Sequence, residues 1–186
     1  MISLKDFSPR LYQENILKLC IEKNCLVVLP TGVGKTAIAL LLAIDRLNKF
    51  KDSKILFCSP TKPLCQQHKE TFLMHTSISE EDIMLYTGLI NAKKRSDQLV
   101  SKKIIVATPQ TIASDITNNR MILDDFSLLI IDEAHHSRMK YANTIVAKHY
   151  VGTAKNPRIL ALTASPGSNR EKIKEICENL FIDEIE

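Results

Sequence analysis

Five consecutive residues of the sequence could hold a nucleoside triphosphate: Gly32-Val33-Gly34-Lys35-Thr36, between an apolar run and a helical pattern. Glycines let the chain curl until its backbone N–H groups converge on a phosphate, and the helix that follows adds its positive N-terminus. Lys35 can then reach the β- and γ-phosphates, and the hydroxyl of Thr36 can bind Mg²⁺. The segment therefore predicts a phosphate-binding loop.

Two other interpretations of this loop remain open. Leu29 stands where the full G-x-x-x-x-G-K-[ST] pattern has its first glycine, so an ordinary glycine-containing turn is one alternative. Gly32-x-Gly34-x-x-Ala37 also fits the fingerprint of dinucleotide sites. That fingerprint needs an acidic residue at the end of the second strand, where this sequence has Ser59-Pro60, and it includes no lysine. We therefore favour a triphosphate site.

A pair of adjacent carboxylates supplies the second half of a possible hydrolytic site. Asp132 and Glu133 end the apolar run at residues 128–131. Neighbouring acids at a buried strand end are costly unless a cation or a proton transfer uses them. We expect Asp132 to hold a Mg²⁺ ion shared with Thr36, and Glu133 to orient and deprotonate the attacking water. A solvated acidic turn is the alternative.

The elements that must position these residues follow from the apolar pattern. Strand-like runs occur at residues 25–29, 55–58, 83–86, 104–107, 128–131 and 159–162. Helical patterns lie between them: one capped by Ser8-Pro9, one at residues 36–47, one opening at each of Pro63 and Pro109, and one at residues 169–180. Strands that alternate with helices pair in parallel, and continuous apolar runs indicate strands covered on both faces. We predict an α/β fold, a three-layer α/β/α sandwich with a mostly parallel sheet and its chemistry at one edge.

Length and composition set limits on the class of protein. The 186 residues fit one domain, and no apolar run approaches the roughly 20 residues of a membrane-spanning helix. The N-terminus lacks the pattern of a signal peptide, and the five cysteines form no C-x-x-C pair, so we expect a cytoplasmic protein without a membrane or metal-thiolate role. The net charge of +4 permits a polyanionic partner without requiring one.

Four motifs resemble the first RecA-like domain of superfamily 2, DEAH-type helicases. Arg10-x-Tyr12-Gln13 is similar to the upstream glutamine motif that reads adenine, and residues 29–36 to the superfamily phosphate loop, whose first glycine is commonly replaced. Asp132-Glu133-Ala134-His135 is identified as the DEAH motif. Thr163-Ala164-Ser165 resembles the motif that couples hydrolysis to domain movement. Residues 24–32, 60–64, 107–111 and 162–168 further resemble archaeal Hef and the Fanconi anaemia group M branched-DNA helicases.

The resemblance implies a role for each matching position. The catalytic residues would be Lys35, Asp132, Glu133 and His135; the ATP-binding residues Arg10, Gln13, Thr31, Gly32, Val33, Gly34, Lys35 and Thr36; the Mg²⁺ ligands Thr36 and Asp132; the nucleic-acid contacts Pro60, Thr61, Lys62, Thr87, Gly88, Thr108, Pro109, Gln110 and Thr111; and the coupling residues Thr163, Ala164 and Ser165. Threonine, glutamine and lysine make good phosphate contacts and poor base readers, so we expect sequence-independent binding. Residues 91–95 and Lys102-Lys103 would add positive charge nearby.

The function expected from this resemblance is half of an ATP-driven motor. Residues 1–186 would be the ATP-binding domain, with ATP and Mg²⁺ as cofactors and single-stranded or branched DNA, rather than RNA, as the partner. Such motors close a second RecA-like domain over ATP, and its arginines are absent from this sequence. We therefore expect slow hydrolysis and no unwinding by this chain alone. The alternatives are an RNA helicase domain, a nucleotide-switched nucleic-acid-binding module, and a small-molecule P-loop kinase, which the absence of a lid-like basic segment weakens.

Overall fold

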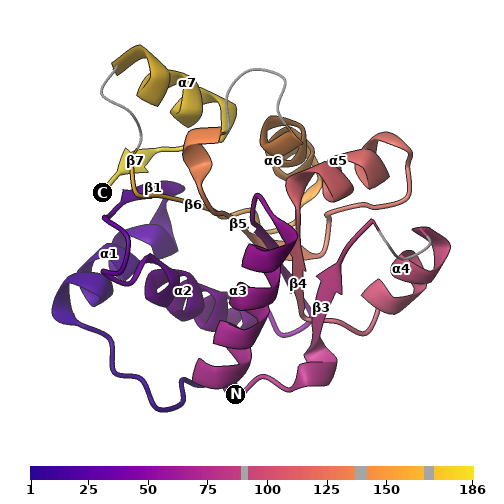
Figure 1. Cartoon of the computed structure of the whole chain (residues 1–186), viewed down its shortest axis with the longest axis horizontal. Coiled ribbons are helices and arrows are strands. Elements are labelled where there is room, and N and C mark those ends of the chain that lie inside the picture. The colour runs from indigo at the N-terminus through magenta and orange to yellow at the C-terminus, as the bar shows by residue number, and fades with distance from the viewer. Residues whose placement is uncertain (89–91, 137–141, 166–169) are drawn as a thin grey trace.

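A seven-stranded sheet in the order β3-β4-β2-β5-β6-β1-β7 forms the middle layer of the protein. The computed structural model describes residues 1–88, 92–136, 142–165 and 170–186 (Figure 1). Every paired strand is parallel to its neighbour. The strands are β1 Cys25–Val28, β2 Lys54–Cys58, β3 Ile83–Tyr86, β4 Ile104–Ala107, β5 Phe126–Ile131, β6 Ile159–Thr163 and β7 Glu184–Ile185.

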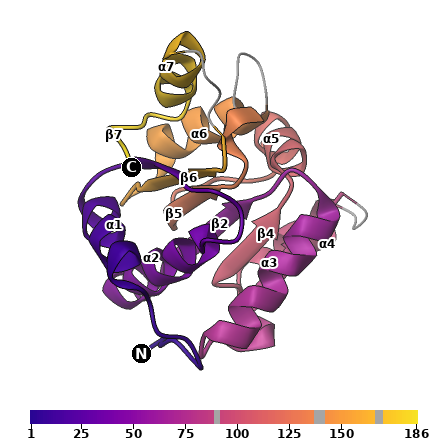
Figure 2. The ribbon, with the colours of Figure 1, turned by 60° about the vertical axis from the view of Figure 1, so that its left-hand side comes forward.

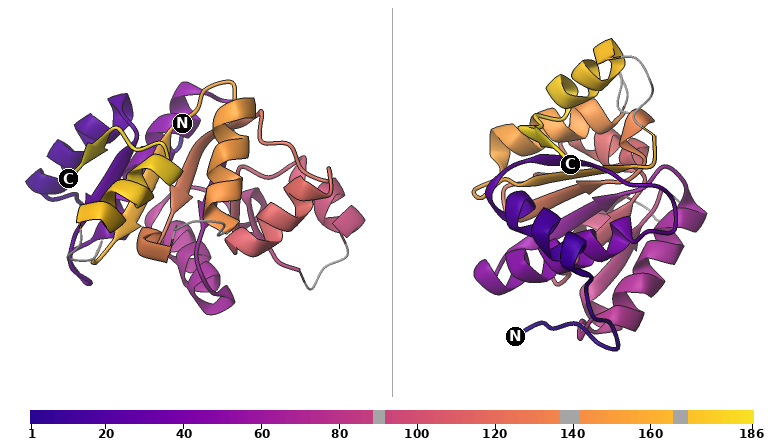
Figure 3. Two further views of the ribbon diagram at one scale, coloured as in Figure 1. Left: turned by 90° about the horizontal axis from the view of Figure 1, so that it is seen from above. Right: turned by 90° about the vertical axis from the view of Figure 1, so that its left-hand side faces the viewer.

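Helices cover both faces of this sheet, which confirms the predicted three-layer sandwich. They are α1 Leu11–Glu22, α2 Lys35–Lys49, α3 Lys62–His75, α4 Ala92–Leu99, α5 Pro109–Thr117, α6 Ala142–Thr153 and α7 Arg170–Asn179, with short 3₁₀ turns at Glu80–Asp82 and Ala134–His136. Helices α1, α2 and α3 lie on one face, and α5, α6 and α7 on the other (Figures 2 and 3).

Alternate residues of each central strand enter opposite cores. Leu26 belongs to the core that contains residues of α5, α6 and α7, whereas its neighbours Cys25 and Val27 belong to the core that contains residues of α1, α2 and α3. Because both faces are covered, these strands are apolar throughout, as the sequence pattern predicts.

The parallel arrangement brings the polar strand ends to one edge of the sheet. The phosphate loop follows β1, Ser59 follows β2, Asp132 follows β5, and Thr87 and Thr108 follow β3 and β4. In the strand order, β5 lies between β2 and β6, and β6 separates it from β1. The two carboxylates therefore lie near the middle of the edge, with the phosphate loop on one side and the ends of β3 and β4 on the other.

Three features differ from the sequence prediction or were absent from it. The first helix begins at Leu11 and not at Ser8-Pro9. Gln13 Oε1 accepts the backbone N–H of Arg10 at 2.8 Å, and this contact caps the N-terminus of the helix at Arg10. Strand β7 pairs with β1 but has only two residues, too few to show a period. Helices α4 and α6 were not assigned from the sequence. Among the described residues, no helix is long and apolar enough to cross a membrane.

Candidate nucleotide and nucleic-acid site

The loop between β1 and α2 has the backbone that a phosphate-binding loop requires. Gly32 and Gly34 have φ angles of 83° and 93°, in the region that residues with a Cβ rarely adopt. Gly34 is the N-cap of α2, so the helix begins at Lys35, and Thr36 lies in its first turn. Thr31 and Gly32 are exposed at the tip of the loop, and Val33 is half-buried. The loop can therefore present the positive end of a helix to an anion at the surface.

The ammonium group of Lys35 lies against its own loop. Its Nζ donates to the carbonyl oxygen of Leu29 at 2.8 Å and to that of Pro30 at 3.4 Å. Leu29, at the position of the missing glycine, thus holds the Lys35 ammonium through its backbone carbonyl. A triphosphate would compete with these two carbonyl groups for the ammonium.

Two residues of α1 donate hydrogen bonds to the backbone of this loop. The buried side chain of Gln13 donates from Nε2 to the carbonyl of Gly34 at 3.3 Å, and the hydroxyl of Tyr12 donates to the carbonyl of Val33. A Cβ on Gly34 would lie 2.4 Å from Gln13 Nε2. Arg10 is exposed at the start of the helix. The predicted adenine-reading segment therefore lies beside the phosphate loop, and its contacts with the loop backbone were not foreseen.

The carboxylate of Asp132 is held by groups from β2 and α3. Its backbone N–H donates to the carbonyl of Cys58 at 2.9 Å, and its Oδ2 lies 3.4 Å from Ser59 Oγ and 2.9 Å from His68 Nε2. The side chain of Asp132 is only 11% exposed. His68 was not predicted as a site residue. It lies on the buried stripe of α3 with Cys65 and Phe72, and this spacing was the available signal.

The residue after Asp132, Glu133, has a left-handed backbone and a more exposed side chain than Asp132. Its φ angle is 51°, a conformation that costs an L residue about 1 kcal/mol or more. Its Oε2 lies 3.3 Å from Nδ1 of His135, and the same nitrogen lies 3.1 Å from the hydroxyl of Thr163. That hydroxyl also accepts the backbone N–H of Ser165 at 3.3 Å. The contacts thus join the predicted catalytic residues Glu133 and His135 to the predicted coupling residues Thr163 and Ser165, and Ala164 lies between these last two in the chain. Residues 166–168, which also carry the family resemblance, lie outside the described residues.

A pocket of about 210 Å³ connects these carboxylates to part of the predicted nucleic-acid surface. It is lined by Asp132 and Glu133 together with Pro60, Pro109, Gln110, Ala142 and Asn143. Thr61 and Lys62 are exposed beside it at the start of α3, where Thr61 Oγ1 accepts the N–H of Leu64 as the helix cap. The predicted nucleic-acid contacts and hydrolytic residues are therefore neighbours.

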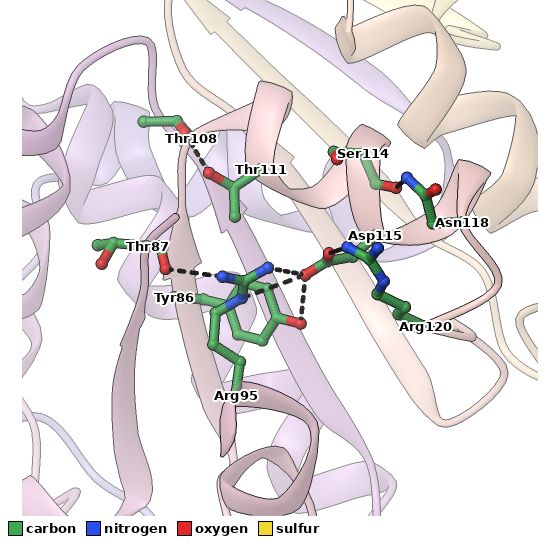
Figure 4. Close-up of polar contacts among 9 residues, drawn as sticks. All are labelled: Tyr86, Thr87, Arg95, Thr108, Thr111, Ser114, Asp115, Asn118 and Arg120. Atoms are coloured by element: carbon green, nitrogen blue, oxygen red, sulfur yellow. Dashed lines mark hydrogen bonds and ion pairs between the residues drawn. The ribbon is translucent and has the colours of Figure 1, made fainter. Parts of the chain in front are cut away.

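The remaining predicted nucleic-acid contacts gather at the ends of β3 and β4. Thr108 and Thr111 face each other in the first turn of α5, with their hydroxyl oxygens 3.0 Å apart (Figure 4). A Cβ on Gly88 would lie 3.9 Å from the hydroxyl of Thr111, so the turn after β3 approaches the same place. Hydroxyl and backbone groups at a helix start are suited to phosphate contacts and not to base reading.

A buried ion pair between Arg95 and Asp115 lies beneath the ends of β3 and β4. Arg95 is therefore not part of the surface charge that the sequence suggested. Arg95 is 6% exposed; its Nη2 lies 2.6 Å from Oδ2 of Asp115, and its Nη1 donates to the carbonyl of Thr87 at 3.3 Å (Figure 4). Tyr86 donates its hydroxyl to the same Asp115 oxygen at 2.8 Å, and burial raises the pKa of that hydroxyl, as does Asp115. Asp115 was not predicted, although it shares the buried face of α5 with Ile112 and Ile116.

Two other basic residues named from the sequence do not join the site. Lys102 and Lys103 precede β4 and so lie at the opposite edge of the sheet, where they contact Glu81 and Asp82. Asn91 lies outside the described residues. Charge near a motif in the sequence was a poor guide here, because one strand length separates the two edges.

Comparison with known proteins identifies relatives along almost the whole chain. A family model described as DEAD/DEAH box helicase matches residues 10–173. The chain is 44% identical, over 100% of its length and 23% of the relative's, to a Methanocaldococcus jannaschii protein named as an ATP-dependent RNA helicase. It is 38% identical to the ATP-dependent DNA helicase fml1 of Schizosaccharomyces pombe, over 96% of this chain and 22% of that one.

A solved structure shares the fold as well as the sequence. The crystal structure of the Pyrococcus furiosus Hef helicase domain matches with a TM-score of 0.91 and 47% identity, over 96% of this chain and 37% of that chain. The chain thus spans less than a quarter of the two relatives above and little more than a third of this domain. With the family model matching residues 10–173 and the Hef fold matching nearly throughout, the chain belongs to the DEAD/DEAH box helicase family.

Proposed function

We propose that this chain is the ATP-binding half of a nucleic-acid motor, with its nucleotide at the β1–α2 loop. The observation that carries the proposal is the shared sheet edge: a loop with two positive-φ glycines and Lys35, and the Asp132-Glu133 pair two strands away. In this proposal Lys35 binds the β- and γ-phosphates, and Gln13 and Tyr12 keep the loop in shape. Gln13 would also contact adenine, together with Arg10.

The donor set fits a Mg²⁺ ion that keeps most of its water and phosphate ligands. Magnesium in nucleotide sites is held by one or two protein oxygens, and not by a dedicated protein cage. Asp132 offers one carboxylate and Thr36 one hydroxyl, and no cluster of three His, Cys, Asp or Glu residues suited to a metal occurs among the described residues. When bound, the ion would neutralise charge on the phosphates.

Hydrolysis would then depend on Glu133. Its carboxylate would accept a proton from water as the water oxygen bonds to the γ-phosphorus and the bond to the ADP oxygen breaks. His135, Thr163 and Ser165 would relate this site to nucleic-acid binding. We further propose that a second RecA-like domain supplies arginines to the γ-phosphate, so that turnover by residues 1–186 alone is slow. Arginines of this kind are worth on the order of 10³-fold or more in related systems.

The proposed partner is a single nucleic-acid strand, bound through its backbone. The supporting features are the exposed residues Thr61 and Lys62 at the start of α3, Gln110 at the start of α5 and Gly88 in the turn after β3. Pro60, Pro109 and Gln110 line the carboxylate pocket. We favour DNA because the relative fml1 is named a DNA helicase. Branched DNA in particular is what the sequence resemblance to archaeal Hef implies. RNA is the alternative, because the M. jannaschii relative is named an RNA helicase. The five free thiols support a reducing, cytoplasmic location.

Calorimetric titration of Mg²⁺-ATP into the wild type and Lys35→Ala, with phosphate release followed on the same samples, tests the nucleotide site. Binding that Lys35→Ala abolishes, with little turnover, supports the proposal; a wild type that binds no nucleotide contradicts it. Matched DNA and RNA single strands, titrated at several salt concentrations, test the partner. Affinity that survives high salt or follows base sequence would argue against backbone binding.

A further inference from the structure

A histidine on α3 lies on the Asp132 carboxylate. His68 Nε2 is 2.9 Å from Asp132 Oδ2, and the side chains are only 9% and 11% exposed. This is the shortest polar contact that the described residues make to this carboxylate, since Ser59 Oγ lies 3.4 Å from the same oxygen. Both contacts end on Oδ2, which leaves Oδ1 as the oxygen that can face a ligand.

The imidazole of His68 is held in one orientation by its surroundings. Its ring lies 4.3 Å from the ring of Phe57 on β2, at an interplanar angle of 33°. One turn earlier on α3, the thiol of Cys65 contacts the carbonyl of Ser59 at 3.7 Å, which anchors the helix to the end of β2. This packing restricts the ring, so that it presents Nε2 to Asp132 Oδ2 from one direction.

The protonation pattern of the ring also suits this role. A carboxylate oxygen accepts, so Nε2 must carry the proton that it donates. The other nitrogen, Nδ1, is buried and has no hydrogen-bond partner among the described residues. The neutral ring protonated at Nε2 leaves no N–H group stranded at Nδ1, whereas a ring protonated at Nδ1 would bury an unsatisfied donor. His68 therefore acts as a directed hydrogen-bond donor to Asp132.

We infer that His68 is a positioning residue for the metal-binding carboxylate. Resting on the proposed function of Asp132, the inference is that the hydrogen bond to Oδ2 fixes the rotamer of Asp132 and so directs Oδ1 toward the Mg²⁺ of Mg²⁺-ATP. Hydrogen bonds that orient a metal ligand typically change metal affinity by about 10- to 100-fold when they are removed.

The test separates orientation of the metal ligand from general stability. ATP is titrated calorimetrically into each variant in Mg²⁺ and in EDTA, and thermal unfolding is recorded on the same samples. His68→Leu should lose most of the gain in affinity that Mg²⁺ gives, about tenfold, while its affinity in EDTA stays within about twofold of the wild type. His68→Gln, whose amide nitrogen can replace Nε2, should restore the gain. His75→Leu is the matched control, because His75 ends the same helix and its Nδ1 is also buried without a partner among the described residues.

The outcomes distinguish this inference from the function on which it rests. If Asp132→Asn loses the Mg²⁺ gain and His68→Leu keeps it, the inference is wrong and the proposed function stands. If His68→Leu loses equal affinity in Mg²⁺ and in EDTA, or if His68→Gln fails to restore the gain, the role is structural and the inference is also wrong. If Lys35→Ala binds ATP as the wild type does, the proposed nucleotide site is wrong, and the inference falls with it.

Discussion

Nδ1 of His135 lies 3.1 Å from the hydroxyl oxygen of Thr163, and the same nitrogen lies 3.3 Å from the carboxylate of Glu133. A single ring nitrogen either carries a proton or offers a lone pair. With the proton it can donate to Glu133 or to the hydroxyl oxygen of Thr163, and without the proton it can accept the hydroxyl proton of Thr163. One ring nitrogen of His135 therefore contacts both the predicted water-activating residue and the predicted coupling segment.

Replacing Thr163 with Val should uncouple Glu133 and His135 from the predicted coupling segment at residues 163–165. The change keeps the shape of a fully buried side chain but removes the hydroxyl that contacts His135 and accepts the N–H of Ser165. We expect the free energy of unfolding to fall by about 1 kcal/mol, the typical net value of a hydrogen bond. ATP affinity should be unchanged, whereas the effect of ATP on single-strand affinity should decrease. Denaturant unfolding and paired titrations measure these quantities; an unaltered ATP effect would argue against a coupling role.

Substituting the two loop glycines should reveal how closely Gln13 packs on the loop. Gly32→Ala meets no atom within 4 Å, so it should suffer only the backbone strain of a positive φ, about 1 kcal/mol. Gly34→Ala has the same strain and in addition places its Cβ 2.4 Å from Gln13 Nε2. We expect Gly34→Ala to weaken ATP binding roughly tenfold more than Gly32→Ala, equivalent to about 1.4 kcal/mol. Equal effects in calorimetry would mean that the contact with Gln13 is unimportant.

The sequence predicted the strands and the active edge because both depend on local patterns. Each predicted strand ends within one residue of its observed carboxyl end, since a run of buried apolar residues stops where polar loop residues begin. The motif residues follow these ends, so their common edge was predictable from parallel pairing alone.

The supporting polar residues could not be predicted, because their roles depend on tertiary contacts. His68 and Asp115 interrupt apolar helix faces, and only the packed structure shows that one meets Asp132 and the other Arg95. Arg95 belongs to a basic segment of the sequence, yet it is buried by its ion pair. Charge in a sequence does not show on which side of a helix, or at which edge of a sheet, a side chain will lie.

Breaking the buried ion pair should be far more costly than breaking an exposed one. Asp115→Asn would leave Arg95 buried beside a neutral group, and loss of one partner in such a pair typically costs about 3–5 kcal/mol. Tyr86→Phe removes one hydrogen bond to Asp115 and should cost about 1 kcal/mol. Asp125→Asn is the matched control: its partner Lys155 and Asp125 itself are 66% and 51% exposed, so it should change stability far less than Asp115→Asn. Chemical denaturation measures all three.

The same ion pair should also influence nucleic-acid binding. Arg95 holds the carbonyl of Thr87, so Tyr86→Phe, the milder variant, should weaken single-strand affinity with little change in ATP affinity. If Asp125→Asn weakens strand affinity as much as Tyr86→Phe does, the network has no specific part in positioning the turn after β3.

Thiol labelling can check the two cores without any ligand. All five cysteines are free, and four of them, Cys20, Cys25, Cys58 and Cys65, are buried. Burial raises the pKa of Cys65 to about 11 and, together with Glu178, raises the pKa of Cys177 above its usual value. Because the thiolate is the reactive form, a raised pKa lowers the labelling rate at neutral pH, and the rate should increase about tenfold per pH unit below the pKa. We expect one thiol, Cys177, to react with a disulfide reagent in the folded chain and five in denaturant. Cys177→Ser should leave the folded protein almost unlabelled; rapid reaction of a second thiol in that variant would mean that a core opens far more readily than its packing indicates.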